Sequence, residues 1–276
     1  MGDGACFLRA AVPLSRFPLM DGKLCGHFCP WGSRRISLYK GVCRMGLHPL
    51  FTLGGRLQLC ASMVRPGTAL ADIGTDHAYL PIWLAKQGLV SRAIAADIRT
   101  GPLQSAQQNI RRYRVEELVS TRLSDGLEAI FSVEADDIVI AGMGGEMMIQ
   151  IIKNASWLRD GEKRLILQPM TSVPQLREFL AQQGFAVLWE QAAVEDGYAY
   201  SAMQVQYAPE EVGTDSLYPY IGKLDAATED NRAYMRKVIA QLEKKAGGLA
   251  VSGRQEEAAA LIRTAEQINM KMKEER

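Results

Sequence analysis

The sequence predicts an α/β fold in which a mostly parallel sheet is covered by helices and followed by a pair of long C-terminal helices. Short apolar runs alternate with amphipathic stretches between residues 51 and 210, and two strand-like runs near the end of that series are joined by only three residues. Polar sequence with helical periodicity follows Pro209. We therefore divide the chain into an N-terminal extension (1–50), an α/β domain (51–210) and a coiled-coil domain (211–276).

The extension is expected to be poorly ordered. It contains four prolines and no sustained periodicity. It also holds seven Lys and Arg against two acids, although the whole chain has a net charge of only +1, so the rest of the chain is net acidic. Two origins stay open, a transit-like leader and a true start at Met45. Cys25, His27 and Cys29 lack the spacing usual in zinc sites, and we expect no metal.

The composition is that of a globular protein without a membrane span. The chain is 47% hydrophobic and 23% charged, and no apolar run reaches the roughly 18 residues that a membrane helix needs. Four of the five cysteines fall within the first 44 residues, which does not suit a disulfide framework and favours a reducing compartment. We expect a cytoplasmic monomer that does not contact membranes.

The elements of the α/β domain follow from periodicity. A lead-in helix is predicted between Leu53 and Val64, ahead of the break at Pro66. Five strands are then predicted over 69–73, 93–97, 119–123, 137–141 and 164–168. Helices are predicted over 78–87, 102–113, 126–131, 145–154 and 173–183. The last two strands, 185–194 and 198–206, must pair antiparallel because their connection is so short.

The C-terminal helices carry an apolar seam with alternating steps of three and four residues. Its members are Met235, Val238 and Leu242 on one helix and Ala258, Leu261, Ala265, Ile268 and Met272 on the next. Gly247-Gly248 and Ser252-Gly253 are predicted to form the turn between them. This pattern predicts a two-helix antiparallel coiled coil.

Acidic residues end three successive strands, and ligands of such folds bind at that edge of the sheet. Asp72 is followed by Gly74, which lets a ligand approach the backbone, and by Asp76, which would repel a phosphate. The pair of acids suits the ammonium and sulfonium groups of S-adenosylmethionine. Asp97 can accept hydrogen bonds from ribose hydroxyls and Asp125 from an adenine amino group. The alternative is that these acids are helix caps or ordinary loop residues.

Two further segments point to the same edge. After the fourth strand, Gly144 and Gly145 lead into a helix and leave bare backbone where a planar base could lie close, although a tight turn alone would also explain them. Gln168 precedes a proline, is held extended, and is aimed at this edge as a substrate contact. Arg56 on the lead-in helix is a candidate partner for the cofactor carboxylate, with a solvated arginine as the alternative.

Four strings of residues resemble the TrmK family of bacterial tRNA methyltransferases. They are DIGTDHAYLP at 72–81, AGMGG at 141–145, LQP at 167–169 and EDGY at 195–198. The resemblance runs from about Leu53 to Lys273 and implies a class I methyltransferase with a Rossmann-like sheet that uses S-adenosyl-L-methionine to methylate N1 of adenine 22 in tRNA. Asp97 departs from the family, in which glutamate is more usual, and the N-terminal extension is not needed by it.

The resemblance extends the expected sites to neighbouring residues. We expect catalytic roles for Asp76, His77, Gly144 and Gly145. Cofactor binding is assigned to Arg56, Asp72, Gly74, Thr75, Asp97, Ile98, Asp125, Gly126, Ala141 and Gly142. Substrate binding is assigned to Tyr79, Met143, Gln168, Arg236, Lys237, Lys244 and Lys245. The basic residues of the coiled coil have a plainer alternative, which is to keep that surface soluble.

Other functions stay open at this level. A class I methyltransferase acting on another RNA, a protein or a small molecule would share the cofactor residues, and a noncatalytic nucleotide-binding module would share the fold. The coiled coil favours a macromolecular substrate, and the three strand-end acids favour catalysis.

Overall fold

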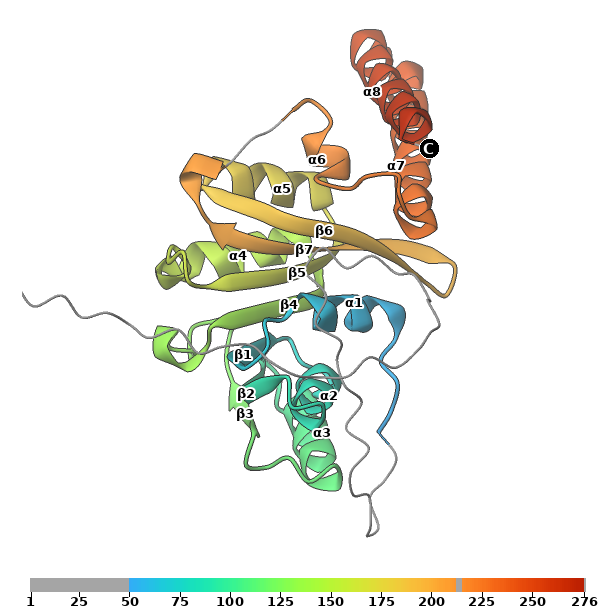
Figure 1. Ribbon diagram of the computed structural model, residues 1–276. Coiled ribbons are helices and arrows are strands. Elements are labelled where there is room, and N and C mark those ends of the chain that lie inside the picture. Colours follow the sequence, from blue (N-terminus) through green and yellow to red (C-terminus); the bar gives the residue numbers. More distant parts are fainter. Residues whose placement is uncertain (1–49, 212–214, 276) are drawn as a thin grey trace, which may run out of the picture. The chain divides into compact units, whose positions relative to one another are not determined.

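The computed structural model describes residues 50–211 and 215–275, so nearly all of the N-terminal extension, with its cysteines and Met45, lies outside the described residues. Within them the chain forms a seven-stranded sheet in the order β3-β2-β1-β4-β5-β7-β6 (Figure 1). The strands are β1 (Thr68–Ile73), β2 (Val90–Asp97), β3 (Val119–Leu123), β4 (Asp137–Gly144), β5 (Arg164–Thr171), β6 (Phe185–Glu195) and β7 (Tyr198–Tyr207).

The pairing of the strands confirms the predicted sheet. The first five strands are parallel, and β7 pairs antiparallel with both β5 and β6. The last strand of the chain therefore lies between β5 and β6, with the β6–β7 turn formed by Asp196 and Gly197, which both have positive φ. This arrangement is typical of class I methyltransferases.

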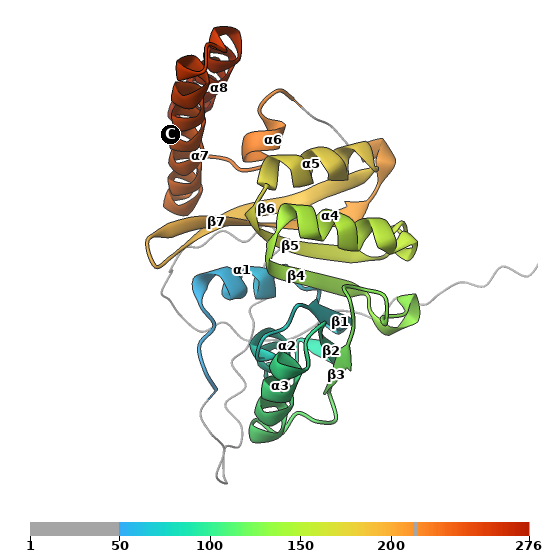
Figure 2. The same cartoon turned by 180° about the vertical axis from the view of Figure 1, so that it is seen from behind.

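Helices cover both faces of the sheet because its central strands are apolar on both sides. Ile138 and Ile140 face one core, which also holds Met148 of α4 (Gly145–Asn154) and Leu176 of α5 (Val173–Gln182). Val139, between them, faces the other core. That second core is covered by α1 (Gly55–Met63), α2 (Tyr79–Lys86) and α3 (Thr100–Arg112). Figure 2 shows α4 and α5 in front of the sheet.

One predicted helix is wrong. Residues 126–129 form a turn, and a short 3-10 helix follows at Ser132–Glu134. Gly126 has a φ of +52°, and the Ser124 hydroxyl accepts a hydrogen bond from the Ala129 amide at 3.0 Å and donates to the Gly126 carbonyl. These side-chain contacts replace the backbone hydrogen bonds that a helix would need.

The C-terminal helices form the predicted antiparallel pair, with one correction. They are α7 (Glu229–Val251) and α8 (Gln255–Glu274), preceded by the short α6 (Tyr218–Ile221). The helix α7 runs through Gly247-Gly248, which was predicted to break it, and the turn forms only at Ser252-Gly253. Ala246 is buried against the partner helix, and such packing outweighs the low helix propensity of two exposed glycines.

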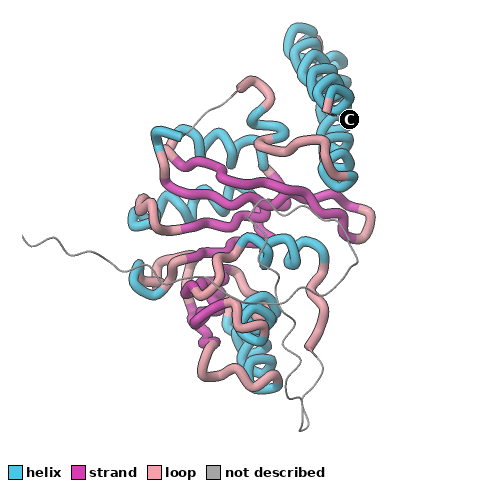
Figure 3. The backbone as a smooth tube through the Cα atoms, viewed as in Figure 1, coloured by secondary structure: helices cyan, strands magenta, loops and turns pink. Residues whose placement is uncertain are grey.

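The coiled coil is fixed to the end of the β6–β7 hairpin (Figure 3). Tyr234 and Met235 of α7 pack with Ala192 and Ala199 of the hairpin. Asn231 accepts a hydrogen bond from the Ala192 amide at 2.8 Å. The seam between the helices is buried at Met235, Val238, Leu242, Ala258, Ala265 and Ile268, and Leu261 and Met272 are partly buried beside it. None of the described helices is both long and apolar enough to cross a bilayer.

Candidate active site at the carboxyl edge of the sheet

The parallel register brings the ends of β1 to β5 to one edge. Ile73 lies opposite Ala96 on one side and Ile140 on the other, and Asp97 lies opposite Leu123. The last residues of these strands and the loops that follow them therefore share this edge, and together they hold most of the residues predicted to bind cofactor.

Asp72 is a buried carboxylate with no cationic partner. Its side chain is 8% exposed, and among the described residues no Lys, Arg or His forms an ion pair with it. Burial raises the pKa of Asp72 from 3.8 to about 6, and a hydrogen bond from Thr75 opposes that rise. A bound cation would relieve this desolvation.

The loop after β1 is tied to its neighbours. The amides of Gly74 and Thr75 both donate to the carbonyl of Ala96 on β2, at 2.8 and 2.9 Å. Gly74 has a φ of +76°, and a Cβ there would lie 2.0 Å from the Met143 Cε. The positive φ favours glycine at this position, and the missing Cβ lets the Met143 methyl group at the end of β4 lie against the loop after β1.

Asp76 and His77 lie on the surface at the start of α2. Their side chains are 70% and 41% exposed, and the His77 Nε2 is 3.1 Å from an Asp76 carboxylate oxygen. The His77 carbonyl accepts a hydrogen bond from Asn109, and its ring lies 5.3 Å from that of Tyr79, which is 40% exposed. Both predicted catalytic residues can therefore meet a substrate from outside.

The second and third acids differ in exposure. Asp97 is 5% exposed, and the described hydrogen bonds use only its Oδ1, which accepts from the Arg99 amide at 2.8 Å and its guanidinium at 3.4 Å. Its Oδ2 accepts none of the described hydrogen bonds. Ile98 is 59% exposed beside it. Asp125 is exposed and lines a hollow with Leu127, so an acid and an apolar side chain adjoin as adenine recognition would require.

Gly142 and Gly144 at the end of β4 and Gly145 at the start of α4 are needed for different reasons. Gly142 has a φ of +77°, where the ladder between β4 and β5 is irregular. Gly144 and Gly145 have no positive φ, so a left-handed turn does not explain them. A Cβ on Gly145 would lie 2.5 Å from the carbonyl oxygen of Ser172, so glycine is needed for the start of α4 to approach the β5–α5 connection. The strand β4 thus continues to Gly144, beyond its predicted end at Ala141.

Gln168 is a support of the site. It is fully buried, and its Oε1 accepts hydrogen bonds from the Arg56 Nη1 at 2.9 Å and from the Gly142 amide at 3.1 Å. Its Nε2 donates to the Pro169 carbonyl. The amide is therefore satisfied inside the protein, and the structure places Gln168 behind the edge, where it holds Arg56 and the loop after β4 together.

Arg56 is held by a second residue that the sequence did not single out for this purpose. Glu195 accepts a hydrogen bond from the Arg56 amide at 2.8 Å, and its carboxylate lies 3.6 Å from the Arg56 Nε. The guanidinium also lies 5.7 Å from the ring centre of Tyr200. Glu195 belongs to the EDGY string at the β6–β7 turn. The sequence indicates this string, but it does not indicate that Glu195 contacts Arg56.

The four basic residues predicted on α7 fall into two groups. Arg236 pairs with Glu229 at 2.5 Å, and the Lys237 ammonium donates to the Ala199 carbonyl at 2.6 Å. Lys244 and Lys245 are exposed, and no ion pair of the described residues involves them. Burial lowers the pKa of Lys237.

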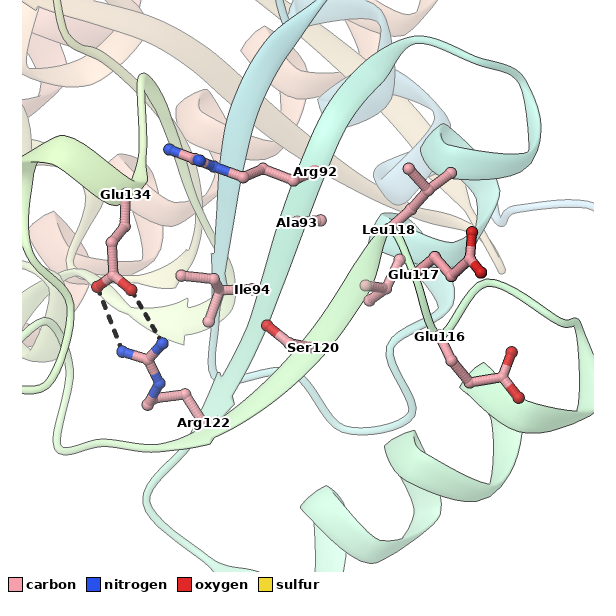
Figure 4. A pocket seen from close by; sticks show the side chains of 10 residues that line it. Arg92, Ala93, Ile94, Glu116, Glu117, Leu118, Ser120, Arg122 and Glu134 are labelled. Carbon is pink, nitrogen blue, oxygen red and sulfur yellow. Dashed lines mark hydrogen bonds and ion pairs between the residues drawn. The ribbon is translucent and has the colours of Figure 1, made fainter.

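A separate hollow at the outer side of β2 and β3 is not the site (Figure 4). Most of its lining comes from β2, the start of β3 and residues 116–118, which precede β3, away from the carboxyl edge. Its Arg122 and Glu134 are already paired at 3.0 Å. Among the described residues, no group of three His, Cys, Asp or Glu side chains is arranged to hold a metal ion.

Comparison with known proteins agrees with this geometry. A family model described as a methyltransferase domain matches residues 53–203. A tRNA (adenine(22)-N(1))-methyltransferase from Bacillus subtilis is 34% identical over 194 residues, which span 69% of this chain and 82% of that protein.

Solved structures give the same result. The crystal structure of the B. subtilis m1A22 tRNA methyltransferase TrmK matches with a TM-score of 0.71 and 28% identity, over 79% of this chain and 98% of that one. The structure of M. capricolum TrmK with S-adenosyl-homocysteine matches with a TM-score of 0.68 and 25% identity, over 79% and 99%. From these matches, this chain belongs to the TrmK family of bacterial tRNA (adenine(22)-N1)-methyltransferases.

Proposed function

We propose that this protein transfers a methyl group from S-adenosyl-L-methionine to N1 of adenine 22 in tRNA. The observation that carries the proposal is Asp72, a buried carboxylate without a cationic partner at the edge where the motif loops meet. The B. subtilis relative named for this reaction shares 34% identity, and the M. capricolum relative was solved with the demethylated cofactor.

The residues at the edge fit the cofactor in charge and shape. Asp72 would face its positive charge, Asp97 would accept from its ribose through the free Oδ2, and Asp125 would meet the adenine amino group. Arg56 would pair with its carboxylate, steadied by Gln168. The remaining members of the proposed cofactor site supply backbone and flanking contacts and are Gly74, Thr75, Ile98, Gly126, Ala141 and Gly142.

The chain's own residues need to orient the target base and need not deprotonate it. S-adenosyl-L-methionine supplies a methyl group on a positively charged sulfur, and N1 of neutral adenine already carries an in-plane lone pair. The protein must therefore hold N1 in line with the methyl group and exclude water. Gly144 and Gly145, whose missing side chains let the start of α4 pack against Thr171 and Ser172, would fix the backbone beside the flat base. The exposed Asp76 carboxylate, paired with His77, would stabilise the positive charge that develops on the ring.

The RNA-facing side would include Tyr79 and Met143 near the base and the exposed Lys244 and Lys245 near the phosphates. Arg236 and Lys237 are already engaged with Glu229 and Ala199, so we give them weaker roles. We further propose that the enzyme works as a cytoplasmic monomer without a metal.

The function is tested with labelled S-adenosyl-L-methionine and two transcripts of one tRNA, one with adenosine and one with guanosine at position 22. After digestion to nucleosides, we expect labelled 1-methyladenosine from the first transcript only. Label in both transcripts would point to another adenosine, and label in neither would contradict methylation of this RNA. A parallel measurement with the unlabelled cofactor shows whether the protein sample binds S-adenosyl-L-methionine, which is the first step of the reaction.

A further inference from the structure

A second hollow, of about 310 Å³, lies between the β5–α5 connection and α7. Its lining includes Met170 and Ser172 from the end of β5 and the connection that follows, Tyr220 from α6, and Lys237, Gln241 and Lys245 from α7. The mechanism described above uses none of Met170, Tyr220 and Gln241.

The charge of this hollow distinguishes it from its neighbours. Its lining contains two lysines and no carboxylate. By contrast, three glutamates line the hollow of Figure 4, and Asp125 and Glu128 line the one beside α4. Lys245 is exposed, and the ammonium of the half-buried Lys237 lies 5.6 Å from the centre of the Tyr234 ring. An anion here would offset the cost of keeping that ammonium charged.

The rest of the lining suits a flat ring. The half-buried Tyr220 offers an aromatic surface, and Met170, 39% exposed, offers a polarisable one. Val238 and Leu242 form an apolar floor. A ligand that combines a flat ring with a negative charge is a nucleotide, and stacking on aromatic side chains accepts any base.

The hollow adjoins the glycine loop of the site, which is the AGMGG segment at 141–145. A Cβ on Gly144 would lie 3.0 Å from the Thr171 hydroxyl, and one on Gly145 would lie 2.5 Å from the Ser172 carbonyl. Thr171 and Ser172 also line the hollow. A strand of RNA whose base reaches the glycine loop therefore has its neighbouring nucleotide beside this hollow.

We propose that this hollow is a subsite for the nucleotide next to the target adenosine, with its base against Tyr220 and Met170 and its phosphate against Lys245. The proposal rests on the proposed function, because it takes the RNA substrate as given. It makes Tyr220 an RNA-binding contact that lies outside the residues of the transfer step.

Binding of tRNA to Tyr220→Ala and Lys245→Ala tests the subsite. Loss of one base stack should weaken tRNA binding by Tyr220→Ala about 5- to 100-fold, while Tyr220→Phe keeps wild-type affinity. Lys245→Ala should weaken binding of all tRNAs alike and reduce the slope of log affinity against log salt by about 1. Lys86→Ala, which removes an exposed lysine at the far end of α2, should change neither value.

Binding of S-adenosyl-L-methionine and the melting temperature separate recognition from folding, and both should match the wild type in all four variants. Wild-type tRNA affinity of Tyr220→Ala would overturn the subsite, and so would equal losses in Tyr220→Ala and Tyr220→Phe. This outcome is independent of the proposed function, which stands or falls with 1-methyladenosine formation by the wild-type protein.

A photocrosslink gives the position directly. A tRNA with 4-thiouridine immediately 5′ or 3′ of adenosine 22 should crosslink to peptides that contain Met170 or Tyr220. Crosslinks from both positions that map only to other peptides would place the neighbouring nucleotides elsewhere and overturn the proposal.

Discussion

Two buried carboxylates of this protein have opposite surroundings. Glu190, 4% exposed at the junction with the coiled coil, accepts hydrogen bonds from the Arg177 guanidinium at 2.5 and 3.2 Å and from the Lys223 amide at 3.1 Å. Asp72, 8% exposed at the carboxyl edge, has no cationic partner among the described residues. At both positions, burial by itself makes a charge costly.

The difference separates structure from function. The Arg177 guanidinium also donates to the carbonyls of Pro219 and Tyr220, so the ion pair connects α5, β6 and the segment that leads to the coiled coil. Although burial opposes its charge, Glu190 raises the pKa of Arg177. A fully satisfied ion pair belongs to the fold, whereas an unsatisfied buried charge is most stable when a ligand of opposite charge arrives.

The largest expected effect comes from breaking the satisfied pair. Arg177→Ala leaves Glu190 buried without its cation and should lower the free energy of unfolding by about 3 to 5 kcal/mol. Denaturant unfolding measures this loss. Lys223→Ala serves as the control, because it keeps the backbone contact to Glu190. A loss below about 1 kcal/mol for Arg177→Ala would show that the pair does not stabilise the fold.

Asp72→Asn should have the opposite signature. Folding raises the pKa of Asp72 above 3.8, so the folded protein without cofactor binds this proton more tightly than the unfolded chain does. The free energy of unfolding therefore falls as the pH rises from about 4 past about 6 and Asp72 ionises. At pH 8 the variant without cofactor should therefore be as stable as the wild type or more so. Its affinity for S-adenosyl-L-methionine should fall about 10- to 100-fold, as expected for a lost charged hydrogen bond. Reduced stability of the free variant would contradict this assignment.

Asp76 offers a third environment, because its side chain is 70% exposed. Asp76→Asn should lower the single-turnover rate of methyl transfer about tenfold with little change in cofactor affinity, since the carboxylate acts on charge that develops in the transition state. The wild-type rate should stay nearly flat from about pH 6.5 to 8.5. A rate that rises tenfold per pH unit and loses this dependence in Asp76→Asn or His77→Ala would instead reveal a general base.

An effect of similar size is expected at Arg56, which is partly exposed and shared with Gln168 and Glu195. Arg56→Ala should weaken cofactor binding by about 1 to 3 kcal/mol, measured by calorimetry. Glu195→Gln, which keeps a hydrogen-bond acceptor for the Arg56 amide, should weaken it less. Wild-type affinity of Arg56→Ala would remove the guanidinium from the site.

Local patterns in the sequence were sufficient to predict the sheet and the edge. The strand-end acids and the glycine loop needed only periodicity and the rule that parallel strands end together. The position of β7 between β5 and β6 was not predicted, because a short connection fixes antiparallel pairing but not which strand meets β5.

Long-range partners were the main omission. Arg177 and Glu190 lie 13 residues apart, and each looks like a surface charge in its own element. Gln168 was expected to face the substrate, but its amide is satisfied by Arg56, 112 residues away, and by Gly142. Such contacts depend on packing between elements, which periodicity does not encode.

The most direct test of the Asp72 assignment is the number of protons released when S-adenosyl-L-methionine binds at pH 6, obtained by calorimetry in buffers of different ionisation enthalpy. With a pKa of about 6, Asp72 is about half protonated in the free protein and must ionise to face the cofactor's positive charge. We expect the wild type to release about half a proton more than Asp72→Asn at pH 6, where the cofactor's amino group is already protonated, and no more than that variant at pH 8. Equal proton release by the wild type and Asp72→Asn at pH 6 would contradict the pairing of Asp72 with the cofactor.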